Sequence, residues 1–198
     1  MAFNLDGPRA ITLLVEGVCW VAFGAILVMG KRGASKAQTM QDAKSHLGFF
    51  LQGAGYAICF CFPRMMFVPF ASASKTAEIT LSAVACATAI GSVCFCYAAA
   101  RALGKQWALV ARVIEGHELI AEGPYSVVRN PIYLAMWGML IATGLAVSRW
   151  QALAAAAGIF FVGTEIRIRS EERLLREAMG AKFEEYTRRV PALFPRMF

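Results

Sequence analysis

Residues 132–166 read IYLAMWGMLIATGLAVSRWQALAAAAGIFFVGTEI, two apolar runs separated only by Ser148 and Arg149. A helix that crosses the hydrocarbon layer of a bilayer needs about 20 mostly apolar residues, so each run is short by that measure. The tight link between them predicts an antiparallel hairpin. We therefore expect two transmembrane helices, 132–147 and 150–166, with a single re-entrant segment as the alternative.

Small residues recur at four-residue spacing in both arms of this hairpin. They are Gly138 and Ala142 in the first arm, and Ala154 and Gly158 in the second. Pairs of this kind let the backbones of two membrane helices approach closely. We therefore predict that the two arms pack on each other through these faces.

Three more apolar stretches precede the hairpin, at 10–30, 46–62 and 77–100. Of the 198 residues, 58% are hydrophobic and 17% are charged, whereas a soluble domain has roughly 45–50% apolar and about 25% charged residues. This composition indicates lipid as the solvent. The sequence therefore predicts an all-α, polytopic membrane protein with five transmembrane helices.

Positive charge is distributed unevenly around these five segments. Of the 20 Lys and Arg residues, 16 fall in the loop 31–46, the segment 101–131 and the tail after Ile166. Five crossings place all three on one side, and basic residues concentrate on the cytoplasmic side of membrane proteins. We expect the N-terminus outside and the C-terminus in the cytoplasm of a bacterium, with the protein in the inner membrane. The net charge of +7 then indicates contact with anionic lipid headgroups and not nucleic acid.

The six cysteines and two histidines do not form a metal-binding pattern. All six cysteines lie in apolar stretches, and the members of the pairs Cys59/Cys61 and Cys94/Cys96 are separated by a single residue. Structural zinc sites usually space their ligands by two to four residues. We expect the thiols to pack as small apolar side chains, and we predict no metal.

The C-terminal tail has one apolar stripe on an otherwise charged helix. The stripe recurs at helical spacing and consists of Leu175, Met179, Phe183, Tyr186 and Val190. This pattern predicts a C-terminal amphipathic helix that lies at the membrane interface or packs on the cytoplasmic loop. Gly180 is placed to end one helical piece and begin another.

Residues 116–133, GHELIAEGPYSVVRNPIY, lie between the third apolar stretch and the hairpin on the predicted cytoplasmic face. The Gly-Pro and Asn-Pro steps break helical structure there. Irregular backbone at a membrane boundary has to be covered by protein or line a water-filled cavity. Such a cavity has free amides and carbonyls that suit a small polar cofactor, and residues 165–172 bring acidic and basic side chains to the same face.

An ordered series of motifs begins at this segment. They are GHxL (116–119), GPY (123–125), RxPxY (129–133), RIxxEE (167–172) and GxxFxxY (180–186), closed by Val190-Pro191. Over residues 104–195 the series resembles that of isoprenylcysteine carboxyl methyltransferases and their phospholipid methyltransferase relatives. We accordingly divide the chain into a three-helix membrane region, 1–103, and a methyltransferase-like region, 104–198.

The resemblance implies a membrane enzyme that uses S-adenosylmethionine in a cytoplasmic cofactor pocket. The implied acceptor is lipophilic, a prenylated cysteine carboxylate, and reaches the pocket from the membrane lipids. The implied cofactor-binding residues are His117, Leu119, Ile120, Gly123, Pro124, Tyr125, Asn130 and Tyr133. The implied catalytic residues, near the acceptor carboxylate and holding the pocket by ion pairing, are Arg129, Glu171 and Glu172.

The sequence departs from the family pattern at Asn130, where the family usually has His. Asparagine donates and accepts hydrogen bonds but does not titrate near neutral pH. A hydrogen-bonding role therefore survives at this position and a general-base role does not. Methyl transfer needs no base, because a sulfonium is an activated electrophile and a carboxylate is already ionised; alignment and exclusion of water suffice.

Several alternatives stay open at this point. The acceptor could instead be a phospholipid amine or a lipophilic thiol. Membrane sterol reductases share a similar C-terminal arrangement and use NADPH, although their chains are generally longer. A non-catalytic membrane module is the third possibility, and Asn130 is the feature that suggests it.

Overall fold

The computed structural model describes residues 7–32, 40–41, 43–62, 75–104, 112–113 and 119–194. This part of the chain is almost entirely helical. Its helices are α1 (Gly7–Arg32), α2 (Ala43–Cys61), α3 (Lys75–Leu103), α4 (Pro124–Val127), α5 (Pro131–Val147), α6 (Trp150–Met179) and α7 (Ala181–Arg189). Two short strands, β1 (Met40–Gln41) and β2 (Arg112–Val113), pair antiparallel.

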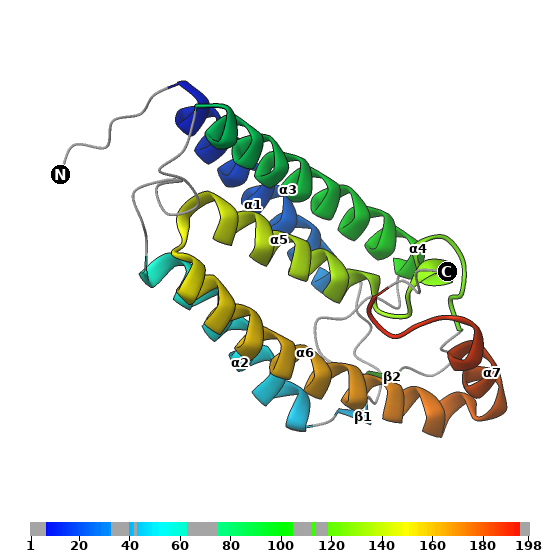
Figure 1. Ribbon diagram of the computed structural model, residues 1–198. Coiled ribbons are helices and arrows are strands. Elements are labelled where there is room, and N and C mark those ends of the chain that lie inside the picture. Colours follow the sequence, from blue (N-terminus) through cyan, green and yellow to red (C-terminus); the bar gives the residue numbers. More distant parts are fainter. Residues whose placement is uncertain are drawn as a thin grey trace.

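The helices α1, α2, α3, α5 and α6 run side by side and alternate in direction along the chain (Figure 1). The ends of α1, α3 and α6 and the starts of α2 and α5 therefore gather at the end of the bundle where α4 and α7 lie. Within the bundle, α3 packs on α1 and α5, whereas α2 packs chiefly on α6. The predicted all-α class is confirmed.

Three helices among the described residues are long and apolar enough to cross a membrane: α1, α3 and α6. The helix α5 is apolar but shorter. Large apolar side chains face outward on these helices, among them Leu14 and Val21 of α1 and Ile90 of α3. A contiguous apolar exterior of this kind suits lipid rather than water.

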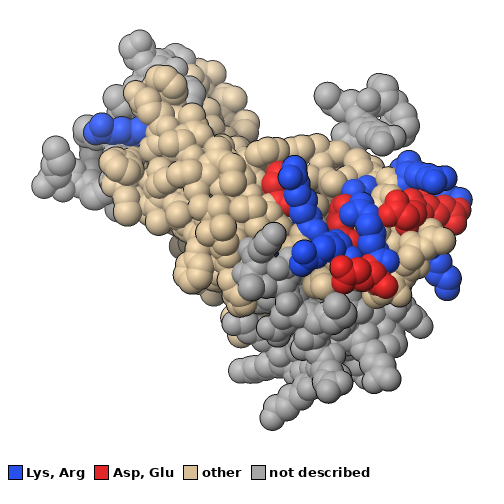
Figure 2. Space-filling model, turned by 90° about the horizontal axis from the view of Figure 1, so that it is seen from below, with Lys and Arg blue, Asp and Glu red and all other residues tan. Residues whose placement is uncertain are grey.

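Among the described residues, charged side chains gather over the end of the bundle where α6 and α7 meet and are sparse elsewhere on this face (Figure 2). The exposed charged residues at this end are Arg169, Arg173, Arg176, Glu177, Lys182, Glu184, Glu185, Arg188 and Arg189. A charged end on an otherwise apolar body suits a protein whose helices lie in lipid while this end lies in water.

The last apolar helix extends much further than predicted. We expected it to end at Ile166, but α6 continues without a break to Met179. Polar residues do not end a helix by themselves, and beyond the apolar run the α6 residues pack on the β2 strand and α7. Arg167, Glu171 and Glu172 therefore project from one rigid helix.

The predicted break at Gly180 is confirmed. Its φ of 53° is left-handed, which favours glycine, and α7 begins at the next residue. The stripe residues Phe183, Tyr186 and Val190 are buried against Leu119 and the end of α6. The amphipathic helix therefore packs on the loop segment that contains Leu119, which is one of its two predicted positions.

The predicted packing face of the hairpin is wrong. A Cβ at Gly138 would clash with Ser92 of α3, whereas Gly158 has nothing within 4 Å and Ala154 is exposed. The physical reason is that α5 packs mainly on α3, and α6 mainly on α2. The close approach of backbones occurs instead between α2 and α6, where a Cβ on Gly163 would lie 2.8 Å from the carbonyl oxygen of Gly48.

Candidate active site

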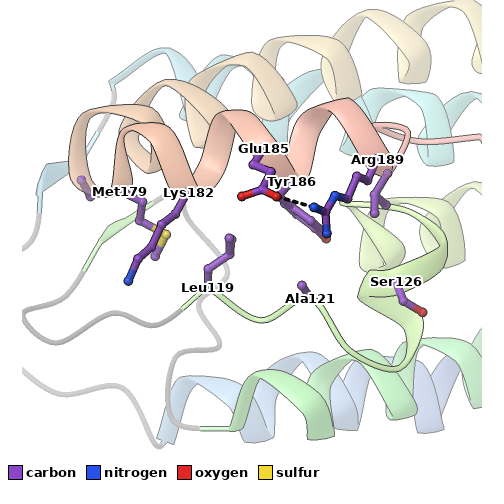
Figure 3. Close-up of a pocket in the computed structure, with 10 residues that line it drawn as sticks. Leu119, Ala121, Ser126, Met179, Lys182, Glu185, Tyr186 and Arg189 are labelled. Atoms are coloured by element: carbon purple, nitrogen blue, oxygen red, sulfur yellow. Dashed lines mark hydrogen bonds and ion pairs between the residues drawn. The ribbon is translucent and has the colours of Figure 1, made fainter.

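A cavity of about 910 Å³ lies between the motif segment, residues 119–133, and the corner where α6 meets α7. Its apolar lining includes Leu119, Met179 and Val190, and its charged lining includes Lys182 and Glu185. Figure 3 shows Leu119 and the neighbouring loop facing the side chains of α7 across this space. Cavities of roughly 300–1,000 Å³ are typical of small-molecule sites, and polar and apolar side chains contribute about equally to the lining of this one.

The Gly-Pro-Tyr motif forms a sharp turn at the edge of this cavity. Gly123 has a φ of 59°, and Pro124 then begins the four-residue helix α4. The side chain of Tyr125 is buried, and the Tyr186 hydroxyl donates a 2.6 Å hydrogen bond to its carbonyl oxygen. The turn is thereby tied to α7.

Both of these tyrosines keep their protons at neutral pH. Burial raises the pKa of Tyr125 well above its usual value, and the nearby Glu171 carboxylate raises it further. Burial also raises the pKa of Tyr186 to about 12, although the Arg129 guanidinium opposes the shift. The Tyr186 hydroxyl is therefore available as a donor to Tyr125, and neither phenol serves as a base.

Arg129 is the centre of an ion-pair network that holds the C-terminal segment in place. Its Nε and Nη2 atoms donate to Oε1 of Glu172 at 3.0 and 2.6 Å. Its Nη1 atom donates to the carbonyl oxygens of Val190 and Thr187 at 2.5 and 3.2 Å. A charge this far from solvent requires such partners. The ion pairing predicted for Arg129 and Glu172 is therefore present, and contact with an acceptor stays a prediction.

Asn130 continues this attachment through hydrogen bonds to backbone. Its Nδ2 atom and its main-chain N–H donate to the carbonyl oxygen of Ala192 at 2.9 and 3.1 Å. The main-chain N–H of Arg129 likewise donates to Pro191 at 2.8 Å. Asn130 therefore makes its hydrogen bonds to the C-terminal segment, and its contact with a cofactor stays a prediction.

A second buried group surrounds Tyr133. Its hydroxyl donates to Oε1 of Glu171, and Nη2 of Arg167 lies 3.9 Å from the same oxygen. The guanidinium carbon of Arg167 lies 4.9 Å from the centre of the Tyr133 ring, within the range of a cation–π contact. Nη1 of Arg167 donates to Oε1 of Gln52 at 3.0 Å. Glu171 and Glu172, adjacent on α6, thus belong to two different groups.

Among the described residues predicted to bind the cofactor, one lines the cavity, and the lining does not include Gly123, Pro124, Tyr125, Asn130 or Tyr133. Leu119 lines the cavity, while Ile120 packs against the hydrophobic core. His117 lies outside the described residues. Within the described part of the chain, no group of three or more His, Cys, Asp or Glu side chains is arranged to hold a metal ion.

Sequence reasoning missed several residues at this end, chiefly Gln52, Lys182 and Tyr186 as a hydrogen-bond donor. Gln52 carried a usable signal, because a polar amide inside an apolar helix marks a functional site by default. Lys182 carried none, since an exposed lysine on a charged helix is ordinary. Its position at the cavity follows only from how α7 folds back on the motif segment.

Two curated relatives are similar to this chain: the nickel-cobalt-cadmium resistance protein NccN of Alcaligenes xylosoxydans xylosoxydans, and the cobalt-zinc-cadmium resistance protein CzcN of Cupriavidus metallidurans. Each is 33% identical over 96 residues, which is 48% of this chain. The chain covers 45% of the first relative and 44% of the second.

A family model described as phospholipid methyltransferase matches residues 80–182, more than half of the chain. The matched region takes in nearly all of α3, the motif segment, the hairpin and the whole of α6. It therefore includes Arg129, Tyr133, Arg167, Glu171 and Glu172 of the two buried polar groups, whereas Gln52 and most of the α7 residues that line the cavity lie outside it. On this evidence the chain belongs to the phospholipid methyltransferase family, whose members are membrane methyltransferases.

Proposed function

We propose that this protein transfers the methyl group of S-adenosylmethionine to a lipophilic acceptor at the α7 end of the bundle. The cavity between the motif segment and the α6–α7 corner carries the proposal. The matched family supplies the reaction class. The apolar outer surface of the helices supports an acceptor that arrives through the bilayer.

The residues present at the cavity fit the cofactor. When bound, S-adenosylmethionine supplies a methyl group on a positively charged sulfur. The apolar side chains of Leu119, Met179 and Val190 suit the flat parts of such a molecule, while Lys182 and Glu185 offer opposite charges to its carboxylate and amine. These residues extend the proposed cofactor-binding set of His117, Leu119, Ile120, Gly123, Pro124, Tyr125, Asn130 and Tyr133.

The chain's own contribution in this proposal is to hold and align. Arg129 and Glu172 fasten the C-terminal segment, and Tyr186 fastens the turn at Tyr125. Neither phenol of this pair is a base near neutral pH. That arrangement suits a reaction in which the nucleophile is already ionised and the protein aligns donor and acceptor and excludes water.

For the acceptor we propose an isoprenylcysteine-type carboxylate, with Arg129, Glu171 and Glu172 as the residues nearest to it. A phospholipid amine is the second candidate, and the description of the matched family favours it. The two differ in charge, so the isolated product distinguishes them. Incubating membranes that contain the protein with methyl-labelled donor, followed by mass spectrometry of lipids and prenylated peptides, identifies the product.

We also propose five membrane crossings, with the N-terminus outside and the C-terminus in the cytoplasm of a bacterium, in the inner membrane. The alternating direction of the helices supports this topology (Figure 1). So does the outer face of α2, where Leu47, Phe50 and Phe60 are exposed. Apolar side chains at these positions suit lipid contact.

A binding experiment tests the cofactor. Purified protein in detergent should be thermally stabilised by S-adenosylhomocysteine, because a ligand that binds only the native state raises stability. At a concentration 100 times Kd the expected gain is about 2.7 kcal/mol. NADPH serves as the comparison ligand. Stabilisation by NADPH and not by S-adenosylhomocysteine would overturn the proposal in favour of a reductase, and stabilisation by neither would favour a non-catalytic module.

A further inference from the structure

A buried polar cluster, made by Gln52, Thr164 and Arg167, joins α2 to α6 inside the bundle. Gln52 is 1% exposed and Arg167 is 3% exposed. Nη1 of Arg167 donates to Oε1 of Gln52 at 3.0 Å, and Nε2 of Gln52 donates to Oγ1 of Thr164 at 3.0 Å. The Gln52 amide therefore uses both its acceptor and its donor within this cluster.

Two glycines let the helices approach closely enough for these bonds. A Cβ at Gly48 would lie 2.5 Å from Cγ of Arg167 and 2.6 Å from the carbonyl oxygen of Gly163. The Arg167 side chain thus passes directly over the backbone of α2. Its guanidinium carbon then lies 5.9 Å from the centre of the Phe49 ring. Contacts with α2 therefore fix the conformation of the Arg167 side chain as much as contacts with its own helix do.

Arg167 is also in contact with two residues of the proposed site. Its guanidinium lies over the Tyr133 ring at 4.9 Å, and its Nη2 atom lies 3.9 Å from Oε1 of Glu171. The Tyr133 hydroxyl donates to that same carboxylate oxygen. A displacement of Arg167 therefore changes the surroundings of both Tyr133 and Glu171.

We propose that Gln52 is a positioning residue for the methyl-transfer site. By holding Arg167, it sets the relative placement of Tyr133 and Glu171, so α2 is a working part of the site although it lies outside the matched region 80–182. The role assigned to Tyr133 and Glu171 rests on the proposed function. The coupling of Gln52 to them rests on geometry alone.

Three substitutions separate this role from simple helix packing. Gln52→Leu keeps much of the side-chain volume but removes the acceptor for Arg167. Gln52→Glu keeps the acceptor, and the Thr164 hydroxyl can donate to it. Tyr56→Phe is the matched control, because it removes a 2.7 Å hydrogen bond from the same helix to the carbonyl oxygen of Met136.

The experiment uses the full-length protein in detergent, with 3-fluorotyrosine placed only at position 133. We expect Gln52→Leu to shift the fluorine resonance and to weaken S-adenosylhomocysteine binding about tenfold or more, since it leaves a buried charge without its neutral partner. Gln52→Glu and Tyr56→Phe should keep both the resonance and the affinity near those of the unsubstituted protein. If Gln52→Leu does not fold, Gln52→Met, which keeps an unbranched side chain and likewise removes the amide acceptor for Arg167, gives the same comparison.

An unchanged resonance in Gln52→Leu would overturn the proposal, and so would an equal shift in Tyr56→Phe. A shifted resonance with unchanged affinity would also overturn it, because the coupling would then have no consequence for the site. If the unsubstituted protein fails to bind S-adenosylhomocysteine, the proposed function fails, while the fluorine comparison still decides whether Gln52 positions Tyr133.

Discussion

Nη2 of Arg129 lies 2.6 Å from Oε1 of Glu172, and this ion pair joins the start of α5 to α6 across 43 residues of sequence. The remaining Arg129 donor contacts go to the carbonyl oxygens of Thr187 and Val190. One guanidinium therefore connects three parts of the chain.

Arg129→Ala should release the C-terminal segment as well as abolish methyl transfer. Among the described residues, the change leaves Glu172 with Arg176 as its one remaining ion-pair partner. The loss of the partly buried, charged hydrogen bond from Arg129 should cost roughly 2 kcal/mol of unfolding free energy. Hydrogen–deuterium exchange should rise across α7. Arg169→Ala is the matched control, because Arg169 is exposed and pairs with Glu165 on the same helix face. Full activity in Arg129→Ala would refute the assignment of Arg129 to the site.

Glu171→Gln should lower turnover by at least about tenfold while the protein stays folded. The amide oxygen still accepts from the Tyr133 hydroxyl, but the negative charge beside Arg167 is lost. Loss of that charge alters the field at the site more than its shape. Steady-state rates are compared with those of Glu165→Gln, a change at a more solvent-accessible carboxylate on α6. Equal rates in the two variants would remove Glu171 from the catalytic set.

Tyr186→Phe should weaken binding of S-adenosylhomocysteine and lower the unfolding free energy by about 1 kcal/mol. It removes the hydrogen bond that ties the Gly-Pro-Tyr turn to α7. The cavity edge should then be less well ordered. Isothermal titration and thermal unfolding measure the two effects, with Tyr97→Phe as the control because Tyr97 is exposed on α3. An unaltered affinity would show that the turn does not depend on α7.

Gly163→Ala should destabilise the protein by about 1–3 kcal/mol, the usual cost of overpacking. The added Cβ would meet the carbonyl oxygen of Gly48 at 2.8 Å and the main-chain nitrogen of Gln52 at 3.0 Å. Gly158→Ala on the same helix should be neutral or slightly stabilising, because nothing lies within 4 Å and alanine favours helix. Thermal unfolding in detergent compares the two, and similar melting temperatures would contradict the close α2–α6 contact.

The proposed topology places the two termini on opposite sides of the membrane. A fluorescent reporter fused to the C-terminus should fold in the cytoplasm, and a periplasmic enzyme reporter fused to the N-terminus should be active. The physical reason is the concentration of Lys and Arg in 31–46, 101–131 and the tail. Reporters active on the same side would require an even number of crossings and would exclude the five-helix arrangement.

Local properties of the chain were predictable because they depend on neighbouring residues. The apolar runs indicated the membrane helices, Gly180 marked the junction of α6 and α7, and the stripe ending at Val190 marked the buried face of the tail. The ordered motifs indicated the family, which the match over 80–182 shows. Hydropathy, helix breaks and the order of motifs can all be determined from the sequence without knowing which helices pack on each other.

Pairing between distant segments was decided only by the tertiary structure. Gly138 and Gly158 suggested that the two arms of the hairpin pack on each other. Which face a helix buries depends on its partner, however, and α6 packs chiefly on α2. The packing of α2 on α6 also brings Gln52 to Arg167. Sequence alone therefore determined a helical membrane protein of a methyltransferase family. Long-range packing determined which side chains meet. The contact between Gln52 and Arg167, for example, joins residues 115 positions apart in the sequence.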